Sequence, residues 1–241
     1  MRRPCACCFA VIFTVAIAGC DHSPADPDPF EPGGALAAKV ADPAVCDPGQ
    51  AGFTAGSTNR FFPLPAGAVW RYEGEDGEER IELQISVLGT KTVAGVITRV
   101  VEEREWIDGA LVELSRNFYA QAGDGTVCYF GEDVDIFDPV TGQVVSHEGA
   151  WLTGGGNQPG IIMPAVPKAG LKYAMERAPG IAEDERTVVG TGPLQLGDEE
   201  FAETIRVREF NPLDGDKGYK VFAAGVGLVV DGPVVLVSRN F

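Results

Sequence analysis

Two groups of carboxylates have residue types and spacing that could do chemistry in this chain. Carboxylates crowded together raise one another's pKa, or they hold a hard cation such as Ca²⁺ through oxygen ligands. If the two groups meet in space, they form a candidate general acid/base pair of the kind that cleaves glycans. If they do not meet, they are solvated strand ends or turns. The residues are Glu132, Asp133 and Asp135, which follow the aromatic segment 128–130, and Glu183 and Asp184, which follow Gly180.

The segment 133–138 begins like an EF-hand calcium loop but does not continue as one. Phe137 stands where Asp or Asn is expected, and Asp138 stands where glycine is required. A calcium-stabilised domain therefore remains one alternative interpretation of the acidic groups. The sequence indicates no other cofactor.

Other catalytic side chains are scarce. The chain has two histidines, His22 and His147. It therefore offers few ligands for a zinc site built on paired histidines and few candidate bases for a catalytic triad. No serine stands in a Gly-x-Ser-x-Gly frame, and neither a lysine nor a helix start follows the glycines at 154–156. These observations favour a non-enzymatic ligand-binding or assembly module. The alternative is a carboxylate-dependent hydrolase that acts on glycans.

Aromatic side chains recur along the same segments. In a curved sheet they would line a pocket for an apolar small molecule, and at strand spacing they would also serve as ordinary core. They are Trp70, Tyr72, Trp106, Phe118, Tyr119, Tyr129, Phe130 and Trp151.

Regular turn signals indicate how these groups would be positioned. Asp-Gly pairs, which favour the type I′ turns of β-hairpins, occur five times from residue 76 onward. Apolar and polar residues alternate between them, as in the segments 81–87, 171–175 and 205–207. Period two with one polar side is typical of an antiparallel sheet packed on one face. The sequence therefore predicts an all-β protein, an antiparallel meander forming a barrel or half-barrel, with a two-sheet sandwich as the alternative.

The part of the chain that precedes these strands has a different composition. Residues 20–58 are rich in Pro, Asp, Ala and Gly, which predicts a disordered tether. A single all-β domain is expected over residues 59–241. A Gly/Pro-rich stretch at 153–167 interrupts its strand pattern, and it is either flexible decoration or a cover over a functional site.

The first twenty residues have the pattern of a secretory targeting signal. A basic head at residues 2–3 precedes an apolar run at 5–18, and two small residues then lead into Cys20. The run is too short to span a bilayer, which takes about 20 residues, but it suits a signal peptide. The ending resembles the lipobox of bacterial lipoproteins. This resemblance implies that residues 1–19 are removed and that Cys20 is lipidated. It also implies a membrane anchor in the cell envelope, with the protein facing the periplasm or the cell exterior.

Charge narrows the choice of partners. Without residues 1–19 the chain has 17 basic and 35 acidic residues, a formal charge of −18. Nucleic-acid phosphates and anionic lipid headgroups repel such a surface. Nucleic acid is therefore not an expected partner, and the lipid at Cys20 would hold the protein on its membrane. Asp21 resembles the signal that retains lipoproteins in the inner membrane of enteric bacteria. The remaining candidate partners are an envelope protein and an apolar small-molecule ligand.

The lipoprotein resemblance also indicates which cysteines remain free to form a disulfide in the mature protein. Three of the six cysteines leave with the signal peptide, and Cys20 carries the lipid. Cys46 and Cys128 remain in an oxidising compartment, where a pair tends to close. We therefore predict a disulfide between them. The alternative is two free thiols, with Cys128 buried as a small apolar strand residue.

The opening of the domain at 59–74 and its ending at 219–229 resemble secreted β-rich bacterial proteins that have no assigned activity. The shared motifs are mainly strand and turn residues. The resemblance therefore implies an exported β-rich domain and brings no functional residues with it.

Overall fold

The computed structural model describes residues 39–241, and nearly all of their regular structure is β-strand. The elements are β1 (Lys39–Val40), the 3-10 helix η1 (Pro43–Cys46), β2 (Val69–Asp76), β3 (Glu79–Val93), β4 (Val96–Ile107), β5 (Ala110–Gln121), β6 (Val127–Phe137), β7 (Val144–Ser146), β8 (Trp151–Leu152), β9 (Gly160–Met163), β10 (Leu171–Ala174), β11 (Glu185–Leu196), β12 (Glu199–Phe210), β13 (Lys217–Ala223), β14 (Gly227–Asp231) and β15 (Val234–Arg239). The prediction of an all-β protein is confirmed.

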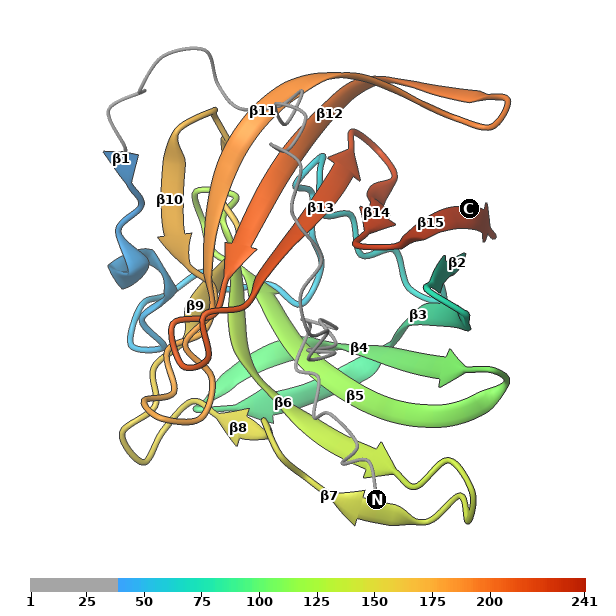
Figure 1. The fold of residues 1–241 in the computed structure, drawn as a ribbon. Helices are drawn as coiled ribbons and strands as arrows, with labels where there is room; N and C mark the ends of the chain where they lie inside the picture. Colours follow the sequence, from blue (N-terminus) through green and yellow to red (C-terminus); the bar gives the residue numbers. More distant parts are fainter. Residues whose placement is uncertain (1–38) are drawn as a thin grey trace.

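The strands form one sheet that contains two antiparallel meanders. Its order is β1-β10-β11-β12-β13-β14-β15-β2-β3-β4-β5-β6-β7, with β8 and β9 paired to β6. The pairing of β15 with β2 joins the meander β2–β6 to the meander β10–β15. Figure 1 shows the sheet curling so that β3–β6 make one wall and β11–β13 make the facing wall. The result is a half-barrel, because ladder pairing does not close the sheet.

The two ends of the curled sheet approach each other at the segment 158–163. β9 pairs with β6, and an isolated bridge joins Gln158 to Arg177 just beyond β10. Gly160 makes this approach sterically feasible, because a Cβ atom there would lie 1.9 Å from the Met175 carbonyl oxygen. The Gly/Pro-rich stretch therefore contributes a structural element that narrows the gap.

Alternation along the strands decides which side chains face the interior. In β3, Ile81, Leu83 and Ile85 are buried, and the residues between them point to the outer face. The register of β4 on β3 places Glu103 opposite Ile85. Because directly paired residues share a face of the sheet, Glu103 belongs to the interior face.

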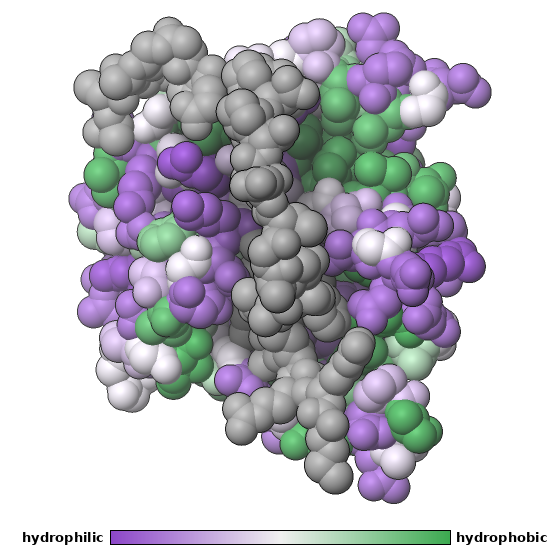
Figure 2. Space-filling view, viewed as in Figure 1, coloured by the Kyte–Doolittle hydropathy of each residue, from purple (hydrophilic) through white to green (hydrophobic). Residues whose placement is uncertain are grey.

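A second, smaller apolar cluster lies apart from the main core. Phe201, Val221, Ala223 and Val229 form it. Its strand neighbours Lys220 and Phe222 point into the half-barrel, so Val221 and Ala223 point to the other face. Figure 2 shows apolar side chains gathered at the upper right, where Figure 1 draws β13 and β14 beneath the β11–β12 hairpin.

The predicted tether is wrong for residues 39–58, which belong to the folded body. β1 adds to the sheet as a parallel partner of β10, and Thr54 forms an isolated bridge with Gln121. The Phe53 ring packs edge-on against Phe130 at 5.5 Å between centroids. These few contacts order a segment whose overall composition is that of a linker.

The predicted disulfide between Cys46 and Cys128 is confirmed. Their Cα atoms are 5.6 Å apart, and both residues are fully buried. The bridge ties η1 to β6, which fixes the N-terminal segment on the sheet.

Residues 1–38 lie outside the part of the chain that the structure describes, and so do the predicted signal peptide, the lipidation site Cys20 and the first part of the predicted tether. Within residues 39–241, no helix is both long enough and apolar enough to cross a membrane.

The closing contact at Gly160 generates a stability prediction. We expect Gly160→Ala to lower the melting temperature by about 5 °C or more, since the added methyl group meets backbone that cannot move aside. Gly190→Ala in β11 is the matched control, because a Cβ atom there meets nothing within 4 Å. Thermal unfolding followed by circular dichroism measures both. Equal melting temperatures for the two variants would contradict the close approach.

Candidate functional site

The first predicted group of acidic residues lies on β6, where strand alternation places its members on opposite faces of the sheet. Glu132 faces the interior and is 1% exposed, whereas Asp133 and Asp135 point to the outer face. Asp133 forms an ion pair with Lys91 at 2.7 Å, and Asp135 Oδ1 lies 3.0 Å from His147 Nδ1. Only Glu132 of this group therefore reaches the interior.

The second predicted group is divided in the same way. Glu183 Oε1 accepts a hydrogen bond from the Gly180 backbone N–H at 2.7 Å, whereas Asp184 is buried beside Glu176. Burial, followed by the charges of Glu132 and Asp184, raises the pKa of Glu176 well above its ordinary value. Burial also raises the pKa of Asp184 to about 6, although its hydrogen bond with Glu176 acts in the opposite direction. The structure thus brings one residue of each predicted group, Glu132 and Asp184, into the electrostatic neighbourhood of Glu176.

Four charged side chains on β11–β14 form a buried network that we call the ion-pair wall. Arg186 Nε donates to Glu209 Oε1 at 2.6 Å, and a second guanidinium nitrogen pairs with the same oxygen. Lys220 Nζ pairs with Asp231 and lies 3.6 Å from Glu209 Oε2. Burial alone disfavours the charged form of Lys220, but the carboxylates of Asp231 and Glu209 raise its pKa. Both bases of the wall are thus held by carboxylates.

Glu103 is a further buried carboxyl on the opposite wall, on β4. Its Oε1 accepts a hydrogen bond from Asn117 Nδ2 at 3.4 Å, and the residue is 7% exposed. Burial raises the pKa of Glu103 well above its ordinary value, and the opposing effect of Lys220 is smaller. The interior therefore holds a desolvated carboxyl whose protonated form is favoured.

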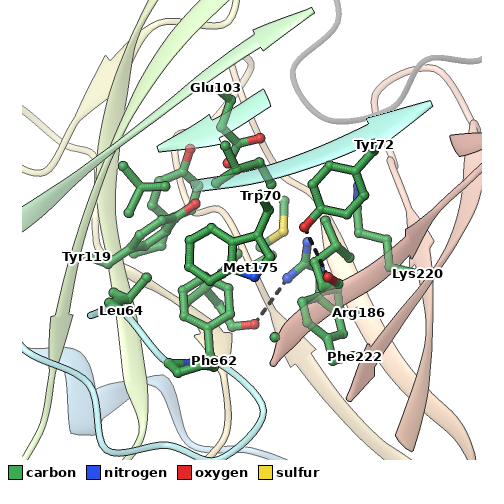
Figure 3. Close-up of a pocket in the computed structure, with 17 residues that line it drawn as sticks. Phe62, Leu64, Trp70, Tyr72, Glu103, Tyr119, Met175, Arg186, Lys220 and Phe222 are labelled. Carbon is green, nitrogen blue, oxygen red and sulfur yellow. Dashed lines mark hydrogen bonds between the residues drawn. The ribbon is translucent and has the colours of Figure 1, made fainter. Parts of the chain in front are cut away.

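A cavity of about 50 Å³ lies between Glu103 and the ion-pair wall. Figure 3 shows Glu103 on one side of the cavity and Arg186 and Lys220 on the other. Its volume is well below the 300–1,000 Å³ typical of drug-sized sites, so it fits a small chemical group. The aromatic residues that line it are Phe62, Trp70, Tyr72, Tyr119, Tyr129 and Phe222.

Several polar donors around the cavity are already engaged. Trp70 Nε1 donates to a backbone carbonyl at 2.8 Å, and the Tyr72 hydroxyl donates to another at 3.0 Å. The Tyr129 hydroxyl donates to Asn117 Oδ1. These bonds fix the three rings in place.

The buried carboxyls are divided between the cavity and its surroundings. Glu176 and Asp184 form a carboxyl pair, but neither lines the cavity. Among residues 39–241, no three or more His, Cys, Asp or Glu side chains are grouped so that they could hold a metal ion. What the cavity offers a ligand is one carboxyl, two bases held by carboxylates, and aromatic walls.

Sequence reasoning missed Glu103, Arg186, Glu209 and Lys220. A signal for Glu209 was present, because Ile205 and Val207 define the interior phase of β12 and Glu209 continues it. A charged residue at a strand position that belongs to the apolar, interior face indicates a buried polar site. The identity of its partner comes only from the register of neighbouring strands.

No family model and no curated protein matches this chain. Two solved structures show a likeness to it. A candidate lipoprotein from Parabacteroides distasonis is 13% identical with a TM-score of 0.36, and the match covers 76% of this chain and 99% of that one. A candidate exported protein with a YmcC-like fold from Bacteroides fragilis is 14% identical with a TM-score of 0.34, over 76% and 100% of the two chains. Likenesses at this level do not assign a function.

The buried carboxyls predict that stability falls as pH rises. Asp184, with a pKa of about 6, and Glu105, raised by burial to about 7, bind protons in the folded state that the unfolded chain releases near pH 4. The free energy of unfolding should therefore decrease between about pH 4 and pH 7, by at most about 1.4 kcal/mol per pH unit for each group.

Chemical denaturation at a series of pH values measures this slope. Asp184→Asn should flatten it between pH 4 and pH 6, whereas Asp133→Asn removes an exposed charge and should leave it unchanged. Stability that is constant or rising over this range would contradict the burial of these carboxyls.

Proposed function

We propose that this chain is a membrane-anchored protein of the cell envelope that binds a small ligand inside its half-barrel without transforming it. The observation that carries the binding part is the cavity, where a buried carboxyl and six aromatic rings surround space for a small group. Concave sites with mostly apolar walls and a few convergent polar groups are typical of ligand binding.

The hydrolase alternative is supported less well by the same geometry. A glycosidase needs two carboxyls on opposite sides of a bound sugar. Among the cavity-lining residues Glu103 is the single carboxylic acid, and Asp133, Asp135 and Glu183 point away from the interior or lie in a turn. Calcium stabilisation stays an untested alternative.

The anchoring part of the proposal rests on the N-terminal sequence. Residues 2–20 have the basic head, apolar run and terminal cysteine of a lipoprotein signal. The described fold begins at Lys39, which leaves residues 21–38 between the proposed anchor and the domain.

Cys20→Ser tests the anchor. We expect the full-length variant to move from the membrane fraction to the soluble envelope fraction, because the lipid chains supply the membrane affinity. Cys8→Ser is the matched control, since Cys8 lies in the predicted signal and should not affect the mature protein. Fractionation followed by mass spectrometry of the N-terminal peptide measures the outcome. An unmodified Cys20 in membrane-bound protein would contradict the proposal.

Filling the cavity tests the binding. Val101 lines the cavity, and its neighbour Val100 points to the opposite face of β4. Small amines, alcohols or carboxylic acids that bind in the cavity should raise the melting temperatures of the wild type and of Val100→Phe. We expect the same compounds to leave the melting temperature of Val101→Phe unchanged.

The milder Val101→Leu variant covers the case in which Val101→Phe is poorly folded. Fragments that stabilise Val101→Phe as much as the wild type would show that binding occurs elsewhere. A complete lack of response in the wild type would remove the proposed function.

A further inference from the structure

We propose that the cavity binds the ammonium group of a small organic cation, with Glu103 as its counter-ion. This inference rests on the proposed function and assigns a ligand class to the same cavity. It is drawn from the hydrogen bonding of Glu103, the engagement of the neighbouring bases, the aromatic walls and the cavity's size.

Glu103 has hydrogen-bonding capacity that the protein does not use. Its carboxyl lines the cavity and is more than nine-tenths buried. Oε1 accepts one long hydrogen bond from Asn117 Nδ2 at 3.4 Å. An ionised carboxylate accepts about four hydrogen bonds, so a buried one with a single long partner is poorly satisfied. An N–H donor in the cavity would supply what is missing.

The two bases that line the cavity are already committed. Arg186 is bound to Glu209 through two of its nitrogens and donates a third hydrogen bond to the Ile162 carbonyl at 3.1 Å. Lys220 pairs with Asp231 and Glu209. An anionic ligand would have to compete with these carboxylates, whereas a cation would meet Glu103 without breaking any pair.

The balance of buried charge also favours a cation. Among residues 39–241, the buried charged residues that do not pair on the outer face are five carboxyls and two bases. An excess of acid in a low-dielectric interior favours the entry of positive charge. The carboxyls are Glu103, Glu132, Glu176, Asp184 and Glu209, and the bases are Arg186 and Lys220.

The aromatic walls suit the same ligand. The rings of Trp70 and Tyr72 line the cavity, and each gives its polar hydrogen to a backbone carbonyl. A cation is attracted to the face of an aromatic ring, with tryptophan the best partner. The cavity of about 50 Å³ accommodates a primary ammonium group with a short alkyl stem.

Binding should be coupled to release of a proton from Glu103. Besides burial, four charged groups act on its protonation: Lys220 on β13, Asp231 on β14, Glu132 on β6 and Arg186 on β11. Tyr72 on β2 and Tyr119 on β5 also face it, since Glu103 helps to raise the pKa of both hydroxyls. Burial outweighs the two bases, so the empty site favours the neutral carboxyl. An entering ammonium ion reverses this balance. Glu103 then loses its proton to solvent, and an ammonium–carboxylate pair forms with no net change of charge in the site.

Three four-carbon probes test the inference: butylammonium, 1-butanol and butyrate, each titrated calorimetrically into the full-length protein. We expect butylammonium to bind best, with an affinity that rises as pH increases. Titration in two buffers of different ionisation enthalpy should show release of up to one proton. Glu103→Gln should weaken butylammonium binding about tenfold or more and abolish the proton release.

Glu105→Gln is the matched control. Glu105 is the next interior position on the same strand but does not line the cavity, so this variant should keep both affinity and proton release. Equal or tighter binding of 1-butanol or butyrate, or unchanged butylammonium binding by Glu103→Gln, would overturn the cation inference while leaving ligand binding intact. If none of the three probes binds, the inference fails, and the Val101 comparison decides the proposed function separately.

Discussion

The pairing of buried charge on β11–β14 is the constraint on which the rest of the interior depends. Arg186 and Lys220 are both buried, and each is held by a carboxylate from a neighbouring strand. Removing one partner of such a pair costs about 3–5 kcal/mol, because the other charge stays buried and uncompensated. The wall is therefore fixed in composition and register. With its bases engaged, Glu103 on the opposite wall is left as a desolvated carboxyl facing the cavity.

Curvature brings these two walls face to face. The meanders β2–β6 and β10–β15 share one seam, at β15 and β2, and approach again where Gly160 passes the Met175 carbonyl. The cavity lies inside this curl, and Glu176 and Asp184 lie next to the second approach, immediately after β10 and before β11.

Sequence predicted the fold class and the disulfide but missed the centre of the site. The alternation of Ile81, Leu83 and Ile85 with polar residues predicted the interior face of β3 correctly. This was possible because the period of two depends only on residues close together in the sequence. Ala94-Gly95 forms a turn with both φ angles positive that composition did not signal, because alanine is not a usual residue there. Glu103 was missed because its burial is set by the register of β4 against β3, which local pattern does not contain.

The most direct test of this account is the pKa of Glu103 itself, read from the ¹³C resonance of its side-chain carboxyl in an NMR pH titration and assigned by its absence in Glu103→Gln. Because the bases of the wall are engaged elsewhere and the carboxyl is desolvated, we expect Glu103 to titrate well above the ordinary range of a glutamate in the ligand-free protein. An ordinary carboxyl titration near pH 4 would contradict it, since Glu103 would then already be ionised and compensated without any ligand.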